Sequence, residues 1–353
     1  MIGSTIAALD GEAMVSRLAP LKASFDGASV LVTGATGFVG TWIVEALAWS
    51  REHLGLDLRL VLPVRNRARL AERLPHLVTQ SWVQVLDGDI REFALSTVTV
   101  DLAIHAASTV TPAALRAAPA DTQHMVMQGT RHVIDEVARA GATRVLLVSS
   151  GSVYGAGRSG GRPITESEGA FTDPFSPGRV LPEAKRAAEA LGAAMGSSLG
   201  VDIIVARGFA MSGPWLPLDT DFALGNFVAD ALAKRVIRPK GSGSAVRSYL
   251  YGADVAVWLL TLLLRGSAGR AYNVGGSSSY LIREVAKLVA EQAGVEMALD
   301  IPYHDLPGTD HFIPDTQRAA ELGLAEWTSL PTAIDRMLSW HSASSFSNSR
   351  ANV

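Results

Sequence analysis

Short apolar runs alternate with amphipathic stretches along residues 28–208. The runs are nearly free of polar positions, which is typical of strands in a sheet covered on both faces. The stretches between them repeat apolar residues at helical spacing. The predicted strands cover residues 30–33, 57–62, 82–86, 102–105, 144–149 and 202–207, and the predicted helices begin near residues 42, 67, 122 and 182. This alternation predicts an α/β fold with a right-handed, doubly wound parallel sheet of the Rossmann type.

The rhythm changes near residue 213, where turns, isolated helices and short strands replace the regular alternation. Helices are predicted at 222–233, 253–265 and 282–293, and short strands near 249–251 and 271–274. We therefore expect four regions: a weakly structured leader at 1–27, a nucleotide-binding domain at 28–212, a smaller substrate-binding portion at 213–341 interleaved with that domain, and a disordered serine-rich tail at 342–353.

Composition narrows the classes of partner. The chain has 353 residues, of which 48% are hydrophobic and 18% charged, enough for a sizeable core. A net charge of −3 gives no general attraction to nucleic acid. The apolar run around 255–264 is too short to span a bilayer, and residues 1–9 lack a basic targeting signal. The absence of cysteine excludes disulfides and thiol nucleophiles, and the histidines show no metal-ligand spacing. We expect a protein of the cytoplasm with no metal, nucleic-acid or membrane partner.

A glycine-rich turn between the first strand and the first helix predicts a dinucleotide site. Gly34 suits a tight turn, Gly37 lets the backbone approach a pyrophosphate, and Gly40 lets the helix pack closely on the strand. The free N–H groups of the helix N-terminus then face the anion. The predicted cofactor-binding residues of this turn are Gly34, Thr36, Gly37, Phe38 and Val39.

The residues after the second and third strands leave the cofactor open between NAD and NADP. Arg65 stands where an acidic residue would bind the ribose hydroxyls, and a basic one accommodates a 2′-phosphate. Asp89 could accept a hydrogen bond from the adenine amino group, with Ile90 beside it, or it could cap the following segment.

An ordered series of motifs resembles the extended short-chain dehydrogenase/reductase superfamily, and within it the NAD-dependent epimerase/dehydratase group that modifies nucleotide sugars. The likeness covers about residues 28–340. The motifs are residues 34–40 (GATGFVG), Asp89, residues 105–108 (HAAS), residues 149–155 (SSGSVYG), residues 185–189 (KRAAE), residues 206–214 (ARGFAMSGP), residues 247–251 (RSYLY) and residues 272–275 (YNVG).

The resemblance implies a set of site residues. Ser150 aligns with the family serine that bonds a substrate hydroxyl or carbonyl, and Lys185 with the lysine that also holds the nicotinamide ribose. Ala106 and Ala107 are expected beside the cofactor, and Ser108 and Ser152 beside the substrate.

Three departures from the family pattern affect the catalytic centre or its surroundings. The family tyrosine, which transfers the hydroxyl proton, stands one helical turn before the lysine, but this chain has Leu181 there. Gly151 and Ser152 replace the Asp-Glu pair of the family 4,6-dehydratases, which makes that reaction unexpected. Val126 also replaces an asparagine of the family pattern. The active centre is therefore predicted to be remodelled.

Three explanations stay open. Another group supplies the acid–base function, with Tyr154, His105, Glu183 and Ser152 as candidates. Alternatively, the reaction needs less proton transfer and uses Ser150 with Lys185 for binding and polarisation. In the third explanation the protein is a catalytically silent NAD(P)-binding protein.

The substrate side of the family pattern is better preserved. Asn226 matches a residue near the nucleotide diphosphate, and Arg247 matches the arginine that pairs with it, where a guanidinium fork is suited to phosphate. The predicted helices 122–140 and 182–199 match those that pair subunits in the family, so a homodimer is expected.

These inferences combine into one hypothesis, with alternatives. The chain is expected to be an NAD(P)-dependent epimerase- or dehydratase-like enzyme that transiently oxidises a hydroxyl of a nucleotide-linked sugar, using Ser150, Lys185 and a substitute base such as Tyr154. A non-redox isomerase or lyase acting on a small metabolite in the same pocket is one alternative. A silent NAD(P)-binding protein is the other.

Overall fold

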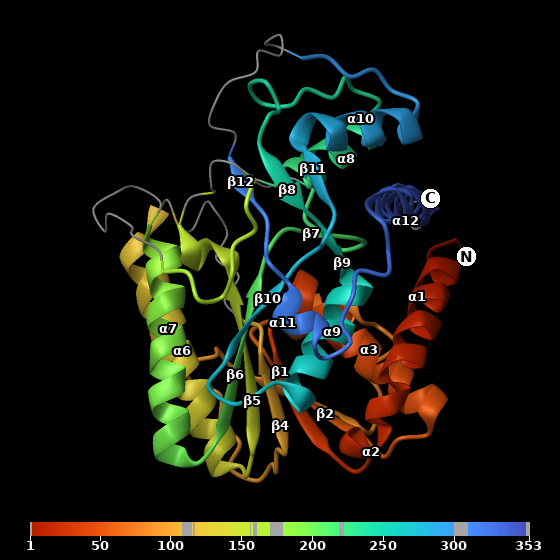
Figure 1. The fold of residues 1–353 in the computed structure, drawn as a ribbon. Coiled ribbons are helices and arrows are strands. Elements are labelled where there is room, and N and C mark those ends of the chain that lie inside the picture. The colour runs from red at the N-terminus through yellow and green to blue at the C-terminus, as the bar shows by residue number, and fades with distance from the viewer. Residues whose placement is uncertain are drawn as a thin grey trace.

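The computed structural model describes residues 2–107, 115, 117–155, 157, 161–169, 179–218, 222–299 and 310–350. Its centre is a seven-stranded parallel sheet in the order β10-β6-β5-β4-β1-β2-β3 (Figure 1). The strands are β1 (Ser29–Thr33), β2 (Arg59–Val64), β3 (Val83–Asp87), β4 (Leu102–His105), β5 (Arg144–Ser150), β6 (Asp202–Gly208) and β10 (Ala271–Val274). The strand order reverses between β1 and β4, so a crevice for a ligand is expected at their carboxyl ends. The predicted doubly wound fold is confirmed.

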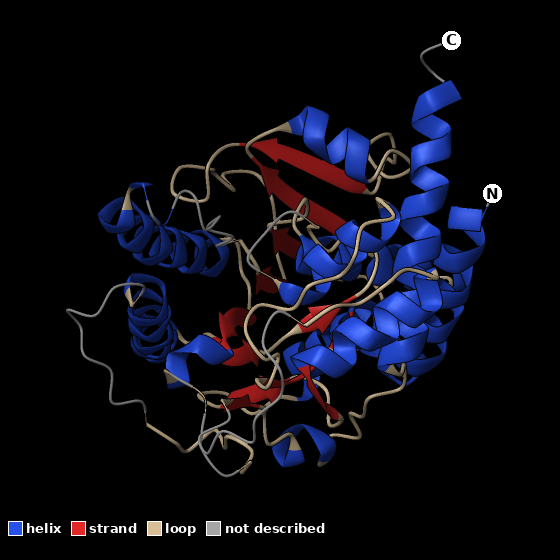
Figure 2. Ribbon diagram, turned by 90° about the horizontal axis from the view of Figure 1, so that it is seen from above, coloured by secondary structure: helices blue, strands red, loops and turns tan. Residues whose placement is uncertain are grey.

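Helices cover both faces of this sheet. Figures 1 and 2 show α6 (Pro119–Arg139) and α7 (Val180–Leu199) packed together on one face. On the other face α3 (Phe38–Leu54) packs against α9 (Gly252–Arg265). The short α4 (Arg67–Arg73) connects β2 to β3. Burial on both faces explains the continuous apolar strands, since all five residues of β1 are buried.

The N-terminal segment is built into the fold, and the prediction of a weakly structured leader is wrong. It forms α1 (Ile2–Leu18), a 3₁₀ turn at Ala19–Leu21 and α2 (Lys22–Phe25). Met14 and Leu18 are buried against the core that α3 and α9 share. Asp10, only 1% exposed, accepts a hydrogen bond of 2.7 Å from the Tyr251 hydroxyl and pairs with Arg336. These partners lie far along the sequence, so local composition did not reveal them.

The chain after β6 contributes to both halves of the molecule. A small sheet in the order β11-β8-β12 consists of β8 (Val246–Ser248), β11 (Ser279–Leu281) and β12 (His311–Phe312), while β7 (Met211–Ser212) pairs with β9 (Leu250–Tyr251). Helices α8 (Ala223–Leu232), α10 (Ile282–Ala293) and α12 (Leu330–Arg350) pack over a separate apolar core. A short α11 (Gln317–Ala320) precedes α12. The domain division at residue 213 stays a prediction.

The C-terminal helix also differs from expectation. Residues 342–350, predicted as part of a disordered tail, continue α12, and 351–353 lie outside the described residues. In Figure 1 the two chain ends lie on the same side of the molecule, where α12 contacts α1. None of the helices within the described ranges is long and apolar enough to cross a membrane.

An aromatic chain joins the two halves beside the cleft. Trp42 of α3 meets Trp215 edge to face at 4.8 Å, and Trp215 meets Trp340 of α12 at 5.0 Å. Trp215 has a left-handed backbone, with φ of +68°, a conformation that costs a bulky residue energy unless its surroundings hold it. Trp42 also donates a hydrogen bond to the Pro214 carbonyl. The loop that follows β7 is thereby fixed against α3.

Candidate active site

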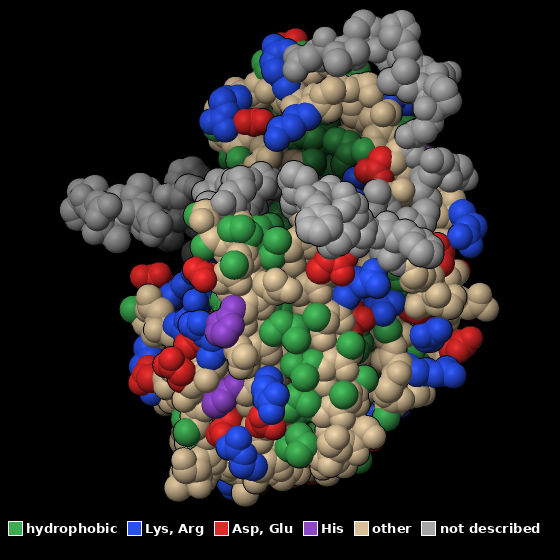
Figure 3. Space-filling view, turned by 90° about the vertical axis from the view of Figure 1, so that its left-hand side faces the viewer, with side chains coloured by type: hydrophobic (Ala, Val, Ile, Leu, Met, Phe, Trp, Pro, Cys, Tyr) green, Lys and Arg blue, Asp and Glu red, His purple; other side chains and the backbone are tan. Residues whose placement is uncertain are grey.

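A cavity of about 1130 Å³ lies between the glycine turn and the C-terminal portion. Gly34, Gly37 and Phe38 form one wall, and Asn226 and Arg247 belong to another. Figure 3 shows a hollow between the lower and upper parts of the molecule, with hydrophobic side chains inside and Lys and Arg at its rim. Its position at the carboxyl ends of the strands is where ligands bind in open α/β sheets.

The glycine turn has the geometry that the sequence predicted. Gly34 has φ of +76°, and a Cβ on it would lie 2.8 Å from the Ala107 nitrogen. A Cβ on Gly40 would lie 2.1 Å from the Gly34 carbonyl oxygen, so only glycine allows this approach of α3 to the turn. Gly37 precedes the first residue of α3 in an extended conformation, without a side-chain cap. The first N–H groups of α3 are thus available to an anion.

Several residues predicted to bind the cofactor line the cavity, and others are not part of its described lining. Val39 and Ala106 join the glycines in the wall. Ala107 donates its backbone N–H to the Thr33 hydroxyl at 3.1 Å, which ties the end of β4 to β1. Thr36 and Ile90 are absent from the described lining of the cavity. Ile90 instead approaches α6, where a Cβ on Gly129 would lie 2.4 Å from its Cδ1 atom.

Asp89 and Arg65 are already engaged with protein groups. The Asp89 carboxylate accepts from the Arg91 side chain at 2.6 Å and from the Arg91 backbone N–H at 3.1 Å. Burial alone would raise the pKa of Asp89, but the hydrogen bonds and charge of Arg91 together lower it. Arg65 lies 4.0 Å from Asp89 and is 70% exposed. Asp89 forms a local turn with Arg91 and still lies just after β3. It therefore remains a candidate both for capping the following segment and for accepting a hydrogen bond from adenine.

Ser150 and Lys185 lie at the end of β5 and in the second turn of α7. The Ser150 hydroxyl accepts a hydrogen bond of 3.1 Å from the Ser152 N–H, and Lys185 Nζ donates to the Val148 carbonyl at 3.0 Å. Burial lowers the pKa of Lys185 to about 8, and the charge of Glu189 opposes this shift. An appreciable share of the amine is therefore neutral near physiological pH. Neither residue is among the described lining of the large cavity.

The structure disfavours Tyr154 and His105 as substitute bases. The Tyr154 hydroxyl donates to Asn273 and accepts from Arg207, both at 2.8 Å, and burial raises the pKa of Tyr154 to about 12. His105 is 5% exposed, and its Nδ1 lies 2.8 Å from the Thr33 hydroxyl. Burial and the charge of Lys185 lower the pKa of His105 to about 3.

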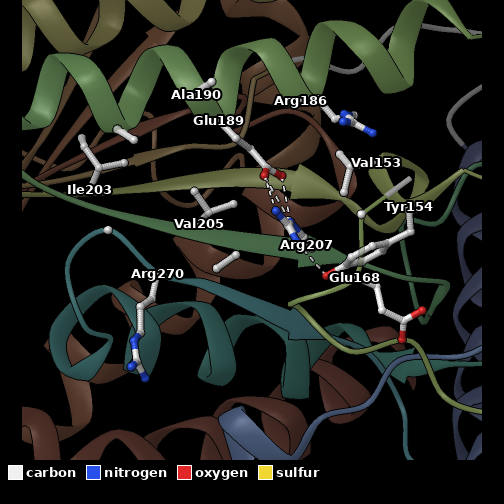
Figure 4. Close-up of a pocket in the computed structure, with 14 residues that line it drawn as sticks. Val153, Tyr154, Glu168, Arg186, Glu189, Ala190, Ile203, Val205, Arg207 and Arg270 are labelled. Carbon is white, nitrogen blue, oxygen red and sulfur yellow. Dashed lines mark hydrogen bonds and ion pairs between the residues drawn. The ribbon is translucent and has the colours of Figure 1, made fainter. Parts of the chain in front are cut away.

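Tyr154 also faces a different cavity. Figure 4 shows this second cavity, of about 420 Å³, where Glu189 of α7 and Arg207 of β6 point toward each other and the Tyr154 hydroxyl reaches Arg207. The Arg207 to Glu189 distance is 2.6 Å, and Ser149 donates to the same carboxylate at 2.5 Å. Tyr154 therefore belongs to a structural network beside β5.

The other two candidate bases have contrasting environments. Glu183 lies 3.7 Å from Arg186 on the same helix. The Ser152 hydroxyl is buried and has no hydrogen-bond partner within the described residues. A buried hydroxyl without a partner is costly, which suits a group that meets a ligand. Ser108, predicted to contact substrate, lies outside the described residues.

Leu181 and Val126, two of the three departures from the family pattern, belong to one apolar cluster between α6 and α7. Val126 is buried there with Ala184 and Ala188, and Leu181 packs against the same cluster with Met125 and Met127. Because Val126 and Leu181 belong to one cluster, each apolar side chain has apolar neighbours to pack against.

On the substrate side, Asn226 lies on α8 in the cavity wall, and Arg247 lies on β8. Arg247 donates to the Asp310 carboxylate at 2.6 Å and to the Asp310 carbonyl at 2.9 Å. The sequence did not predict this pair, since its members are 63 positions apart.

The sequence prediction also missed Arg69 and Arg73 in the cavity wall, although their spacing on one predicted helix could have indicated a shared face. No group of potential metal ligands occurs in the described part of the chain.

Comparison with known proteins assigns the chain to a family. Residues 30–275 match the model of the NAD dependent epimerase/dehydratase family. The chain belongs to this family. The match includes the glycine turn, Ser150, Lys185, Asn226 and Arg247, and it confirms the resemblance derived from the motifs.

Proteins similar to this chain in sequence include UDP-glucuronic acid decarboxylases. UDP-glucuronic acid decarboxylase 1 of Arabidopsis thaliana is 27% identical over 88% of this chain and 69% of its own length. Decarboxylase 2 of the same plant is 27% identical over 86% of this chain and 65% of its own length. The chain thus spans about two thirds of these relatives.

Solved structures of similar fold include a UDP-glucose 4-epimerase from Thermotoga maritima, crystallised with UDP-glucose. It superposes with a TM-score of 0.76 at 20% identity, covering 90% of this chain and 99% of the epimerase. The Bordetella bronchiseptica enzyme WbmF, in complex with NAD+ and UDP, gives a TM-score of 0.76 at 17% identity over 93% and 96% of the two chains. These likenesses confirm the fold.

Proposed function

We propose that this family member is an NAD(P)-dependent enzyme that transiently oxidises a hydroxyl group of a nucleotide-linked sugar. The observation that carries the proposal is the large cavity, in which the glycine turn meets Asn226 and Arg247. The cradle fits a dinucleotide, because Gly34 and Gly40 allow close backbone contacts that hold the tight turn against α3, and the helix N-terminus after Gly37 has no side-chain cap and can face a pyrophosphate. A nicotinamide bound there supplies a hydride acceptor and donor.

The sugar nucleotide is assigned to the wall formed by α8 and β8. Asn226 would donate its side-chain amide to a diphosphate oxygen. Arg247 would give up its contact with Asp310 or share its fork between that carboxylate and the diphosphate, since a guanidinium carries five N–H donors.

Lys185 is the proposed acid–base in the place of the missing tyrosine. Ser150 would bind the reacting sugar hydroxyl, and the hydroxyl proton would pass to the neutral amine of Lys185 as the carbonyl forms. The lowered pKa of Lys185, about 8, supports this role, because a base is most effective when its pKa lies near the working pH. Leu181 cannot take part, since its side chain carries no proton to exchange.

The test is turnover of nucleotide sugars by wild type, Lys185→Met and Lys185→Arg, after mass spectrometry has shown which dinucleotide copurifies. Both variants are expected to lose at least about 100-fold in kcat/KM, the usual contribution of general acid–base catalysis. The wild-type kcat/KM is expected to rise with pH through about 8, because the deprotonated amine is the active form. Lys287→Met, at an exposed i,i+4 ion pair on α10, is the matched control and should keep full activity.

An arginine cannot act as a base at these pH values, so near-normal turnover by Lys185→Arg would contradict the role of Lys185. A protein that binds neither NAD nor NADP would contradict both the proposed enzyme and the silent NAD(P)-binding protein.

A second candidate reaction is decarboxylation, favoured by the similarity to UDP-glucuronic acid decarboxylases. Oxidation of the hydroxyl β to a sugar carboxylate would give a β-keto acid, which loses CO₂ and takes up a proton before the carbonyl is reduced again. Release of CO₂ from UDP-glucuronic acid distinguishes this reaction from epimerisation, which leaves the carboxylate in place.

A homodimer through α6 and α7 is also proposed. Figure 3 shows hydrophobic side chains gathered in a column on the face that these helices form. Leu199 at the end of α7 is 46% exposed, and the outer positions of the helix are rich in alanine, which permits close approach of a second copy. Light scattering of the purified protein tests this assembly.

A further inference from the structure

Cationic side chains from both halves of the molecule surround the large cavity. Arg69 and Arg73 extend from α4, while the C-terminal portion contributes Arg235, Arg238, Lys240 and Arg247. Asp230 is the acidic residue among the described lining. Such an excess of positive charge predicts a ligand with several negative groups.

The C-terminal cations are partly neutralised by neighbouring carboxylates. Arg235 lies 2.8 Å from Asp230, and Arg247 lies 2.6 Å from Asp310. In contrast, neither Arg69 nor Arg73 has a hydrogen-bond or ion-pair partner for its guanidinium among the described residues. On α4, two neighbouring cations of the wall therefore lack a counter-charge among the described residues.

The local fold holds this pair together. Arg69 and Arg73 are four positions apart on α4, so they lie on the same helix face. The Asn66 side chain caps the helix by accepting from the Arg69 N–H at 3.0 Å, and buried Leu70 anchors the helix to the core. Burial and the charge of Arg69 lower the pKa of Arg73 to about 10. Two like charges beside each other in a cleft repel, and a bound anion would remove that cost.

The position of α4 indicates which anion fits. The helix follows β2, and the carboxyl end of the second strand lies next to the adenosine ribose when a dinucleotide occupies a Rossmann site. Two guanidinium groups offer more N–H donors than a neutral hydroxyl pair can use, and they match the oxygens of a phosphate dianion. Arg65 suits this task less well, because it lies 4.0 Å from the Asp89 carboxylate and is absent from the described cavity lining.

We propose that Arg69 and Arg73 form a subsite for a phosphate monoester, and that its occupant is the 2′-phosphate of NADP(H). The inference rests on the proposed function, since it assumes that a dinucleotide binds at the glycine turn. It extends that function by selecting NADP(H) over NAD(H) and by placing the selection on α4 instead of Arg65.

Calorimetric titration of the full chain with 2′,5′-ADP, 5′-AMP and inorganic phosphate tests the subsite at fixed salt. The wild type is expected to bind 2′,5′-ADP at least about tenfold more tightly than 5′-AMP, because one charge-assisted hydrogen bond contributes about this much to affinity. Arg69→Gln and Arg73→Gln should each remove most of this preference and leave 5′-AMP binding unchanged. Arg67→Gln is the matched control on the same helix, because Arg67 is already held by Asp87 at 2.7 Å and should not affect the preference.

The possible results of the titration distinguish an error in the subsite, in its location, in its occupant and in the proposed function. Equal binding of the two nucleotides would overturn the subsite while keeping dinucleotide binding. A preference lost in Arg65→Gln but retained in Arg69→Gln and Arg73→Gln would overturn its location. Binding of inorganic phosphate that depends on Arg69 and Arg73, without a preference for 2′,5′-ADP, would show that the pair serves a different phosphate and overturn the assignment to NADP(H). Binding of neither nucleotide would overturn the proposed function together with this inference.

Discussion

The glycine turn and the α6–α7 contact beside Lys185 both border the predicted reaction centre. Backbone atoms limit the space in the turn, whereas side chains limit it at the helix contact. In the turn, the backbone itself is the constraint, since a Cβ on Gly40 would meet the Gly34 carbonyl oxygen. At the α6–α7 contact, side chains fill the space, and Val126 and Leu181 pack in one apolar cluster. A backbone constraint leaves few residue choices, whereas a packed cluster accepts a coordinated replacement. Under the proposed function, this difference accounts for a chain that keeps the glycine turn and has leucine at the position of the family tyrosine.

The sharpest test of the backbone constraint is Gly40→Ala. The added methyl group would lie 2.1 Å from the Gly34 oxygen and 2.9 Å from the Ala35 Cα atom, and neither atom can move without displacing the turn. We expect a loss of about 3 kcal/mol or more in the free energy of unfolding, together with loss of dinucleotide binding. Chemical denaturation and calorimetry measure the two effects.

Gly169→Ala is the control for this substitution. A Cβ on Gly169 meets nothing within 4 Å, so its stability should change by less than about 0.5 kcal/mol. If Gly40→Ala were as stable as this control, the turn would not be a backbone constraint and the comparison would fail.

The sequence predicted the backbone-determined region well. The strands β4 and β5 begin at the predicted residues, and the Gly34 turn has the positive φ that its glycine indicated. These features depend on local pattern, because a buried strand and a tight turn each impose their residue types on a short segment. The extent of β2, found at 59–64 instead of 57–62, was less exact, since the apolar pattern does not fix strand ends.

Features that depend on contacts distant in sequence were missed. The burial of Asp10 requires Tyr251 and Arg336, and the engagement of Arg247 requires Asp310. Tyr154 was a reasonable candidate base by residue type, but its bonds to Asn273 and Arg207 place it in a structural network. Residue type and motif identified the chemistry available, and the three-dimensional partners decided how each group is used.

The next test concerns the changed acid–base position. Leu181→Tyr restores the family residue in a cluster that now contains Val126, so the phenol would lack its usual surroundings. Since Lys185 is the proposed base, we expect kcat to rise by no more than about threefold and stability to fall by about 1 kcal/mol. Steady-state kinetics on the substrate identified for the wild type measures the first, and thermal unfolding the second.

The double variant Val126→Asn with Leu181→Tyr separates packing from chemistry. If this pair, or Leu181→Tyr alone, raised kcat by tenfold or more, the native centre would be an impaired version of the family site, and the argument for Lys185 as base would fail. Leu181→Ala supplies the control for removing the leucine without adding a hydroxyl.

The smallest expected effect comes from a glycine on α7, where side chains instead of backbone limit the space. A Cβ on Gly192 would lie 2.5 Å from the Leu147 Cδ1 atom, the far end of a side chain that can rotate. Alanine also favours the helix by up to about 1 kcal/mol over glycine, which offsets part of the packing cost. We expect Gly192→Ala to change the free energy of unfolding by no more than about 1 kcal/mol.

Gly196→Ala, one turn later, should cost more, because its Cβ would lie 2.6 Å from the Val201 carbonyl oxygen, a backbone atom. Equal losses at the two positions would mean that the side chains of this region are as rigid as the glycine turn, and the proposed distinction between the two regions would then be wrong.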